Sequence, residues 1–221
     1  MSTSVKIIDT IPVTHNVRHY RVERPKDYRF TPGQATEVSL DKSGWQDKKR
    51  PFTFTSLPDA DVLEFTIKSY FDHSGVTNEL WSSGAGDSLI LRDVWGTIQY
   101  GGPGTFIAGG AGVTPFIAIL RDLDAKGKIA GNRLIVSNQS EKDIILRDEF
   151  EAMEGLEVLW TVTDDPKSNL LQERIDADFL KAHVPDLSGR FYLCGPDQMV
   201  EDLRSDLDQL GADVSNVTWE R

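Results

Sequence analysis

The order of strand and helix signals changes once along this 221-residue chain, and that change limits the folds it can adopt. As far as about Tyr100, short runs of β-forming residues are separated by Gly, Pro and Asp turns, which is typical of antiparallel strands. After the Gly-Gly-Pro-Gly segment at 101–104, apolar strands alternate with helices. This alternation predicts a parallel sheet covered by helices on both faces. The chain is longer than a usual domain of about 100–150 residues, so we expect two domains, 1–102 and 103–221.

The first domain is predicted to be a six-stranded antiparallel β-barrel, because closing the sheet removes its exposed edges. One short helix interrupts the strands, with Thr77 as its candidate cap and residues 78–83 following. The six strands are expected at 5–11, 17–24, 35–40, 52–57, 62–71 and 88–94.

The second domain is predicted to be a parallel α/β domain. Its strands are expected at 105–110, 133–138, 156–164 and 190–195, and its helices at 112–127, 146–153, 178–184 and 196–211. The first strand ends in a glycine-rich turn at 109–112, and Thr114 with Pro115 opens the helix that follows. Such a turn lets the backbone approach a pyrophosphate, whose negative charge the helix N-terminus favours. Taken alone, the turn is also compatible with a plain structural connection.

A second turn, Cys194-Gly195-Pro196, follows the last predicted strand. Ligands of doubly wound sheets bind outside the carboxyl ends of the strands, so the two turns are expected to converge on one crevice. Taken alone, Cys194 is more typical of a small buried hydrophobe. The Rossmann fingerprint is absent, because the second strand ends in Ser-Asn-Gln at 137–139 without the acidic residue, and a different dinucleotide fold is implied.

In the barrel, the segment 50–56 places one cation, Arg50, and several hydroxyl groups beside two phenylalanines. This chemistry suits an anionic phosphate and a planar ring. Taken alone, the segment slightly favours a simpler interpretation, an exposed arginine that precedes an amphipathic strand.

Four motifs in order resemble the ferredoxin–NADP reductase superfamily across nearly the whole chain. They are RPFTFTS at 50–56, GVTNEL at 75–80, GGAGVTP at 109–115 and YLCGP at 192–196. The segments SNQSEKDIILRDEF at 137–150, LWTVTD at 159–164 and IKSYF at 67–71 are especially similar to the NADH–cytochrome b5 reductase branch. The bacterial flavodoxin and ferredoxin reductases are a further branch that the chain resembles.

The resemblance implies roles for individual residues. Arg50 would pair with the flavin pyrophosphate, Phe52 would cover the isoalloxazine, and Thr53 would hydrogen-bond near the flavin N5 as a catalytic residue. Cys194, the second catalytic residue, would line the nicotinamide slot. The remaining residues implied at the flavin are Pro51, Ile67, Lys68, Tyr70, Gly75, Val76 and Thr77, and those implied at the dinucleotide are Gly110, Gly112, Thr114, Asn138, Gln139, Asp164, Gly195 and Pro196.

Two positions depart from the usual pattern of the superfamily. Phe52 replaces a tyrosine, as it does in the free-flavin reductases that this superfamily includes. The sequence ends in NVTWER, whereas many members end in an aromatic residue that is stacked on the flavin. Trp219 is the candidate to take that place.

The resemblance implies a flavoprotein reductase that takes hydride from NADH or NADPH onto bound FAD and passes electrons to a separate redox protein, such as a ferredoxin, flavodoxin or cytochrome. A flavin reductase that releases reduced flavin, and an electron-transfer subunit of a larger complex, remain alternatives. NADH is favoured because Asn138, Gln139 and Ser140 match the NADH-linked branch and Asp164 ends the third strand. Against this preference, Lys142 could meet a 2′-phosphate and Asp164 could be a simple turn residue. FMN in place of FAD, the identity of the acceptor and the oligomeric state stay open.

Composition excludes several other classes of function. The single cysteine excludes a cysteine-ligated iron–sulfur cluster, and the four histidines, at 15, 19, 73 and 183, lack metal-ligand spacing, so no metal site is predicted. A net charge of −11 disfavours nucleic acid as a partner. Without a membrane-spanning apolar run or a signal peptide, the chain is expected in the cytoplasm.

Overall fold

The computed structural model describes residues 2–72, 74–96 and 98–220, so His73 of the metal prediction lies outside the described residues. The chain divides into two compact units. Unit 1 contains Met1–Gln99 with Thr114–Arg121, and unit 2 contains Tyr100–Val113 with Asp122–Arg221.

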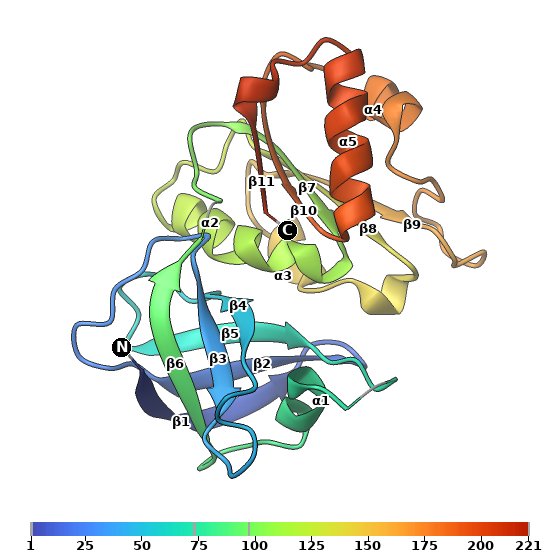
Figure 1. Ribbon diagram of the computed structural model, residues 1–221. Helices are drawn as coiled ribbons and strands as arrows, with labels where there is room; N and C mark the ends of the chain where they lie inside the picture. The colour runs from blue at the N-terminus through green and yellow to red at the C-terminus, as the bar shows by residue number, and fades with distance from the viewer. Residues whose placement is uncertain (1, 73, 97, 221) are drawn as a thin grey trace. The chain divides into compact units, whose positions relative to one another are not determined.

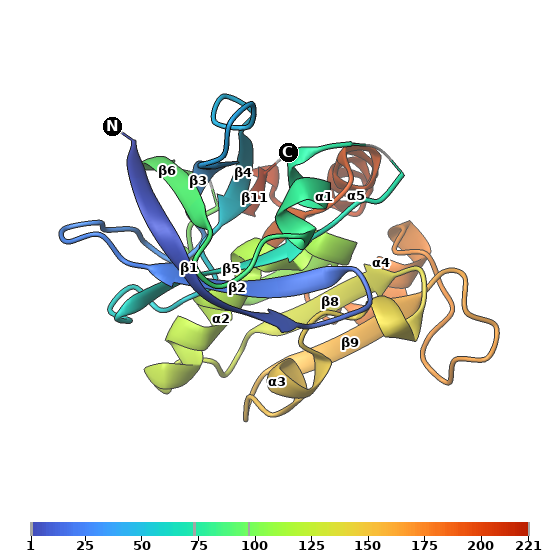
Figure 2. The same ribbon diagram turned by 90° about the horizontal axis from the view of Figure 1, so that it is seen from below.

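Unit 1 contains a six-stranded antiparallel sheet in the order β4-β3-β6-β1-β2-β5, which confirms the predicted strand number and direction (Figure 2). Its strands are β1 (Thr3–Pro12), β2 (Val17–Glu23), β3 (Ala35–Leu40), β4 (Arg50–Thr53), β5 (Val62–Lys68) and β6 (Ser88–Trp95).

The two edge strands of this sheet meet and close it into a barrel. β4 ends at Thr53, and Phe54 then forms an isolated bridge with Phe65 of β5. The next amide, that of Thr55, donates to the carbonyl oxygen of Glu64 at 2.8 Å. The predicted strand 52–57 is therefore divided in two, because the chain leaves β3 and pairs with β5 at the closing seam.

The barrel core positions the short helix α1 (Val76–Trp81). Tyr20, which is fully buried, donates its hydroxyl to the carbonyl oxygen of Leu80 at 2.9 Å. Arg18 donates to the carbonyl oxygen of Trp81 at 2.9 Å and lies over its ring. Both bonds satisfy carbonyls at the end of α1 that have no partner within the helix.

The predicted cap of α1 is wrong. The N-cap is Gly75, with an extended backbone at φ −130° and ψ 175°, and it makes no side-chain capping bond. Thr77 is the second residue of the helix, because the chain turns into α1 two residues earlier than the sequence signal suggested.

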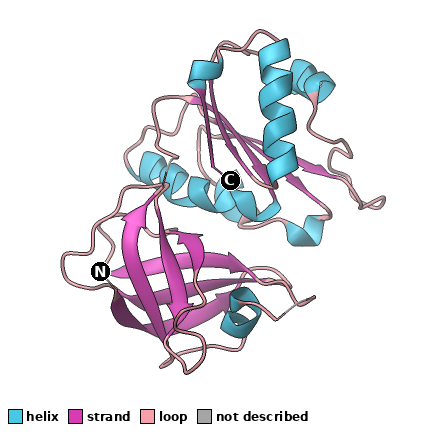
Figure 3. Cartoon of the chain, in the orientation of Figure 1, coloured by secondary structure: helices cyan, strands magenta, loops and turns pink. Residues whose placement is uncertain are grey.

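Unit 2 contains a five-stranded parallel sheet in the order β11-β10-β7-β8-β9, which confirms the predicted α/β arrangement (Figures 1 and 3). Its strands are β7 (Gly104–Gly109), β8 (Arg133–Asn138), β9 (Glu157–Val162), β10 (Arg190–Cys194) and β11 (Val217–Glu220). The helices of the second half of the chain are η1 (Gly110–Val113), α2 (Thr114–Ala125), η2 (Glu141–Asp143), α3 (Arg147–Glu151), α4 (Ala177–His183), α5 (Asp197–Gln209) and η3 (Val214–Asn216).

Helices cover both faces of the parallel sheet in unit 2. Leu193 of β10 packs in one cluster with Phe179 of α4 and Leu203 of α5. Trp160 of β9 points to the opposite face, because side chains alternate along a strand, and its ring lies 6.4 Å from that of Phe150 in α3. The three central strands, β7, β8 and β10, are therefore largely buried, and their ends are the parts that a ligand can reach.

Candidate functional site

The carboxyl ends of β7 and β10 are held together backbone to backbone. A Cβ atom on Gly112 would lie 2.3 Å from the carbonyl oxygen of Cys194 and 2.7 Å from Cα of Gly195, both of which are backbone atoms. Distances below 3.0 Å cannot be accommodated without a shift of the backbone. The two glycine turns singled out in the sequence are thus in contact within unit 2, as expected from the register that pairs Ala108 with Cys194.

Gly110 differs from its neighbours in this turn. Its φ of +53° lies in the left-handed region, which favours glycine, and a Cβ on it would meet no atom within 4 Å. The turn therefore presents an open backbone surface at Gly110, with packed glycines at 109 and 112 behind it. We call this arrangement of residues 109–112 and 194–196 the glycine cradle. Thr114 begins α2 directly after it.

Asn138 ends β8, next to β7, whose Gly109 pairs with Ser137. The residue is 6% exposed, and its amide nitrogen Nδ2 has no hydrogen-bond partner among the described residues. Its backbone oxygen is occupied, since it accepts from the amide of Thr163 at 3.0 Å. Leaving a buried donor unpaired costs about 1–3 kcal/mol, so this strand end offers an acceptor on a ligand a ready partner.

Cys194, half-buried at the end of β10, carries an uncharged thiol. Burial, followed by the nearby charge of Glu220, raises the pKa of the thiol to about 12. The group is therefore neither a thiolate nucleophile nor a metal ligand at neutral pH. It can contact an uncharged ring, the role that the family resemblance implies.

Glu220 is a residue of this edge that the sequence reasoning missed. It lies in register with Cys194 across the β10–β11 pair, and its Oε2 atom is buried without a partner among the described residues. Burial raises the pKa of this carboxyl. The signal that could have found it is the segment VTWE at 217–220, whose alternating apolar residues were not assigned to a strand.

Trp219 points away from Glu220 and packs against the α4–α5 cluster. The guanidinium carbon of Arg204 in α5 lies 3.6 Å from the centre of the indole. One face of Trp219 is thus covered within unit 2, and its stacking on a flavin stays a prediction.

The loops that follow β8 and β9 carry the other predicted dinucleotide residues. Gln139 and Asp164 are both exposed, and the Asp164 amide donates to the carbonyl oxygen of Gln139 at 2.8 Å. The structure therefore brings these two positions together at one edge of the sheet.

The predicted flavin residues of unit 1 lie around the ends of β4 and β5. Arg50 is exposed, its Nη1 atom donates to the carbonyl oxygen of Lys49 at 3.0 Å, and it forms no ion pair within the described chain. Pro51 is exposed, while Phe52 and Thr53 are half-buried. This segment therefore presents one uncompensated cation, an aromatic ring and a hydroxyl group.

On β5 the predicted residues alternate in direction. Ile67 is 2% exposed in the barrel core, so only its backbone is available to a ligand. The Lys68 ammonium lies 5.7 Å from the ring centre of Tyr70, which is 47% exposed. Of the α1 residues, Val76 is in the core and Gly75 with Thr77 is half-buried at the helix start.

Metal and membrane features are also defined for the described residues. No group of three or more His, Cys, Asp or Glu side chains within them is placed to hold a metal ion. Among the described helices, none combines the length and the apolar character needed to cross a bilayer.

Comparison with known proteins identifies the class of this arrangement. Residues 106–205 match the family model of the oxidoreductase NAD-binding domain. NADH-cytochrome b5 reductase 1 of Rattus norvegicus is 28% identical over 249 residues, which span 94% of this chain and 81% of the rat protein. The ferredoxin–NAD(P)(+) reductase component of naphthalene 1,2-dioxygenase/salicylate 5-hydroxylase systems of a Ralstonia species is 27% identical over 208 residues, which span 90% of this chain and 62% of that protein.

Solved structures share the whole fold. A ferredoxin NADP+ reductase from Neisseria gonorrhoeae, solved with bound FAD and NADP, superposes with a TM-score of 0.85 at 21% identity, covering 99% of this chain and 98% of that one. The cytochrome b5 reductase domain of Ulva prolifera nitrate reductase gives a TM-score of 0.86 at 20% identity, covering 100% and 97%.

Residues 106–205 are therefore similar to the NAD-binding domain of oxidoreductases, and the chain shares the two-part fold of a solved ferredoxin NADP+ reductase. Its homologues include NADH-cytochrome b5 reductases and ferredoxin reductases, which confirms the resemblance inferred from the four motifs.

Proposed function

We propose that this chain is a cytoplasmic flavin-dependent reductase that takes hydride from NADH or NADPH, with NADH favoured, onto bound FAD, and passes electrons to a separate redox protein. In this proposal residues 1–102 are the FAD-binding barrel domain and residues 103–221 are the NAD(P)-binding domain. The observation that carries it is the glycine cradle, open at Gly110, beside a strand end where the buried Asn138 amide lacks a partner.

The cradle supports binding of a dinucleotide for two reasons. The open backbone at Gly110 allows close approach of a pyrophosphate, and the N-terminal turns of η1 and α2 favour its negative charge. The Asn138 amide can donate to a ribose or phosphate oxygen, which would satisfy a buried side-chain donor that has no partner among the described residues.

The residues of unit 1 suit a flavin equally well. The Arg50 guanidinium, which forms no ion pair among the described residues, can make a charge-assisted bond to a phosphate. The first turn of α1, after Gly75, offers amide groups to the same anion. The exposed ring of Tyr70 and the half-buried ring of Phe52 provide flat apolar surface for an isoalloxazine. A distinction between FAD and FMN is left to measurement.

A bound flavin supplies acceptance of a hydride and release of electrons one at a time. The residues of the chain bind and orient the two ligands, since hydride transfer needs no strong acid or base. Thr53 provides a hydroxyl for a hydrogen bond near the flavin N5, and the neutral thiol of Cys194 packs against the nicotinamide without introducing charge.

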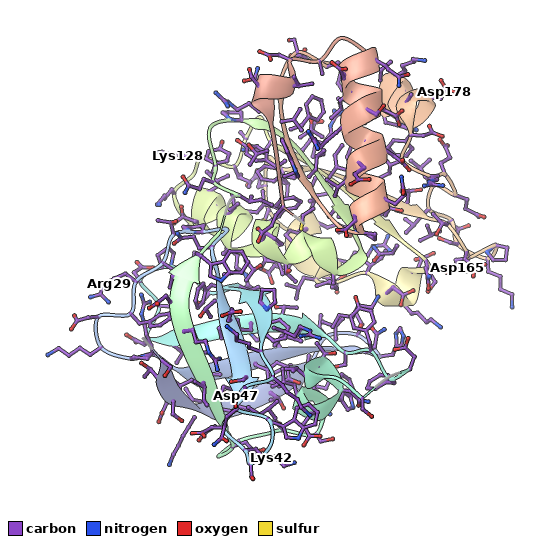
Figure 4. All side chains as sticks on the ribbon, in the orientation of Figure 1. Arg29, Lys42, Asp47, Lys128, Asp165 and Asp178 are labelled. Carbon is purple, nitrogen blue, oxygen red and sulfur yellow. The ribbon has the colours of Figure 1, made fainter. Side chains whose placement is uncertain are left out.

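The acceptor in this proposal is a redox protein such as a ferredoxin, flavodoxin or cytochrome. The loop between β3 and β4, where Lys42 projects (Figure 4), has a basic sequence, yet Lys42 pairs with Glu79 and Lys49 with Glu37. Arg50 thus lies beside a loop whose charges are largely compensated. Because the whole chain carries −11, an acidic acceptor would approach it against long-range repulsion, which salt weakens.

The direct test is the purified full-length protein. We expect a yellow protein with about one FAD per chain by extraction and chromatography, whose visible absorbance bleaches on anaerobic addition of NADH. A protein that neither retains nor reduces added FAD or FMN would contradict the proposal.

A second candidate is a flavin reductase that releases its flavin, and the observation that favours it is Phe52, which has no hydroxyl to hold the cofactor. Equilibrium dialysis separates the two candidates. Micromolar or weaker flavin binding, with turnover that rises with added free flavin, would select the flavin reductase.

A further inference from the structure

Glu141 joins the loop after β8 to the loop after β9 in unit 2. Its backbone amide donates to Oδ2 of Asp165 at 3.1 Å, and its carboxylate accepts from the hydroxyl of Ser168. Figure 4 shows Asp165 in the second of these loops. The same carboxylate accepts from Nη1 of Arg147 at 3.0 Å, which fixes Glu141 to the start of α3.

The Glu141 carboxyl that accepts these bonds is ionised at neutral pH. The hydrogen bond from Ser168, and after it the Arg147 guanidinium, holds the pKa of Glu141 below its usual range. Ser168 is itself 9% exposed, and its hydroxyl also accepts from the amide of Leu170 at 3.0 Å. The hydrogen bond between Glu141 and Ser168, which we call the tie, therefore ends on a largely buried hydroxyl and does not join two exposed side chains.

Asp164 lies between the points where the two loops are fixed. On one side its own amide is bonded to Gln139, and on the other side Asp165 and Ser168 are bonded to Glu141. The Asp164 carboxylate is exposed and takes part in no hydrogen bond or ion pair within the described chain. Its position thus depends on the backbone, and the backbone depends on Glu141.

Cations near this edge fall into two groups. Arg147 is compensated by Glu141 and by Glu151, whose Oε1 atom accepts from its Nε atom at 2.9 Å. Lys142 and Lys167 are exposed, one on each loop, and neither has a carboxylate partner among the described residues. Side chains of both signs are thus exposed near this edge, with Asp164 and Lys167 on the second loop and Lys142 on the first.

We propose that Glu141 is a positioning residue for cosubstrate choice, which holds the β9–α4 loop so that Asp164, rather than a lysine, faces the adenosine ribose of the dinucleotide. The inference rests on the proposed function, since it requires that a nicotinamide dinucleotide binds at this edge of the sheet. A ribose with free hydroxyls donates to the Asp164 carboxylate, whereas a 2′-phosphate is repelled by it.

The test compares Glu141→Ala and Ser168→Ala, with Glu154→Ala as a matched control. Each tie variant removes the side-chain bond between Glu141 and Ser168, while the bond from the backbone amide of residue 141 to Asp165 remains. Glu154 is an exposed glutamate of unit 2 that forms no hydrogen bond or ion pair with this network among the described residues, and Glu154→Ala changes the net charge as Glu141→Ala does. We expect the ratio of kcat/KM for NADH over NADPH to fall at least fivefold in both tie variants, through KM, with kcat within twofold. The double variant should match the single variants, because all three lack the same bond.

A second readout does not depend on hydride transfer. By calorimetry, the affinity for 2′,5′-ADP relative to 5′-AMP should rise at least fivefold in both tie variants and stay unchanged in Glu154→Ala. If both ratios stay within twofold of the control in Glu141→Ala and Ser168→Ala, with folding verified by thermal melting, the inference is overturned. Absence of NAD(P)H oxidation in the wild-type protein would count against the proposed function. The binding ratio of 2′,5′-ADP to 5′-AMP would still test the role of Glu141 in that case.

Discussion

The two units present their candidate ligand groups in opposite ways. In unit 1 the groups are exposed side chains, such as Arg50 and Tyr70, at or just beyond the strand ends. In unit 2 the central group is backbone, and Gly112 is pressed against Cys194 so closely that a methyl group does not fit. Substitutions in unit 1 should therefore weaken binding by degrees, whereas substitutions in the cradle should separate into those that break the fold and those that only block the ligand.

The largest effect is expected for Gly112→Ala. Its Cβ would lie 2.3 Å from the Cys194 carbonyl oxygen, so the strand ends must part, and we expect a loss of about 3 kcal/mol in the free energy of unfolding. Gly110→Ala is the matched control, because its Cβ meets open space and only the positive φ is strained, by about 1–2 kcal/mol. Urea denaturation measures both. Equal losses in the two variants would show that the cradle is not packed as described.

The next largest effect is expected for Arg50→Ala, which tests whether a side chain of unit 1 binds the flavin. Losing a charge-assisted phosphate bond of about 1.5–3 kcal/mol weakens flavin binding ten- to a hundredfold, with the unfolding free energy unchanged. Arg29→Ala, another exposed arginine of unit 1, paired with Asp27, is the control. Flavin titration by fluorescence gives the affinities, and equal values for the two variants would remove Arg50 from the site.

A smaller effect is expected at Asp164. Two unit charges about 4 Å apart at an effective dielectric of about 20 interact by about 4 kcal/mol, and one third of that in an exposed position is about tenfold in specificity. Asp164→Ser should therefore lower the NADH over NADPH ratio of kcat/KM about tenfold, while Asp148→Ser, an exposed aspartate of α3, leaves it unchanged. A wild-type protein that prefers NADPH would contradict the proposed preference.

The smallest effect concerns the pH dependence of stability through Glu220. Burial raises the pKa of the Glu220 carboxyl in the folded protein above its value in the unfolded chain. The folded protein is therefore most stable at low pH, where this carboxyl is protonated, and it loses stability as the pH rises through the folded-state pKa. Glu220→Gln keeps a neutral group, so the variant should match the wild type near pH 4 and be more stable than the wild type at pH 7. Thermal melting at both pH values checks this, and a difference of opposite sign would show that the carboxylate is stabilised by a partner.

The features that could be predicted from the sequence are those that local periodicity determines. The alternation of strand and helix signals gave both sheets, and the glycine turns at 109–112 and 194–196 were found because glycine and proline mark strand ends. It did not give β11, a four-residue strand whose pairing with β10 is set by tertiary structure.

The polar connections of the site were beyond the sequence for a related reason. Glu141 and Ser168 are 27 residues apart, and no local pattern indicates that their side chains meet. The same applies to Glu220 beside Cys194, where only the strand register creates the contact. Long-range register and loop packing are what the sequence alone leaves undetermined.

The seam at which the barrel closes lies directly after the segment that carries Arg50. The amides of Phe54 and Thr55 bond to opposite partners, Gln34 and Glu64, so this is where the sheet changes from one neighbour to the other. A ligand that binds β4 only while the barrel is closed would stabilise this seam by mass action. Slow hydrogen exchange at these two amides would then measure occupancy of the flavin side from within the protein backbone, independent of colour or turnover.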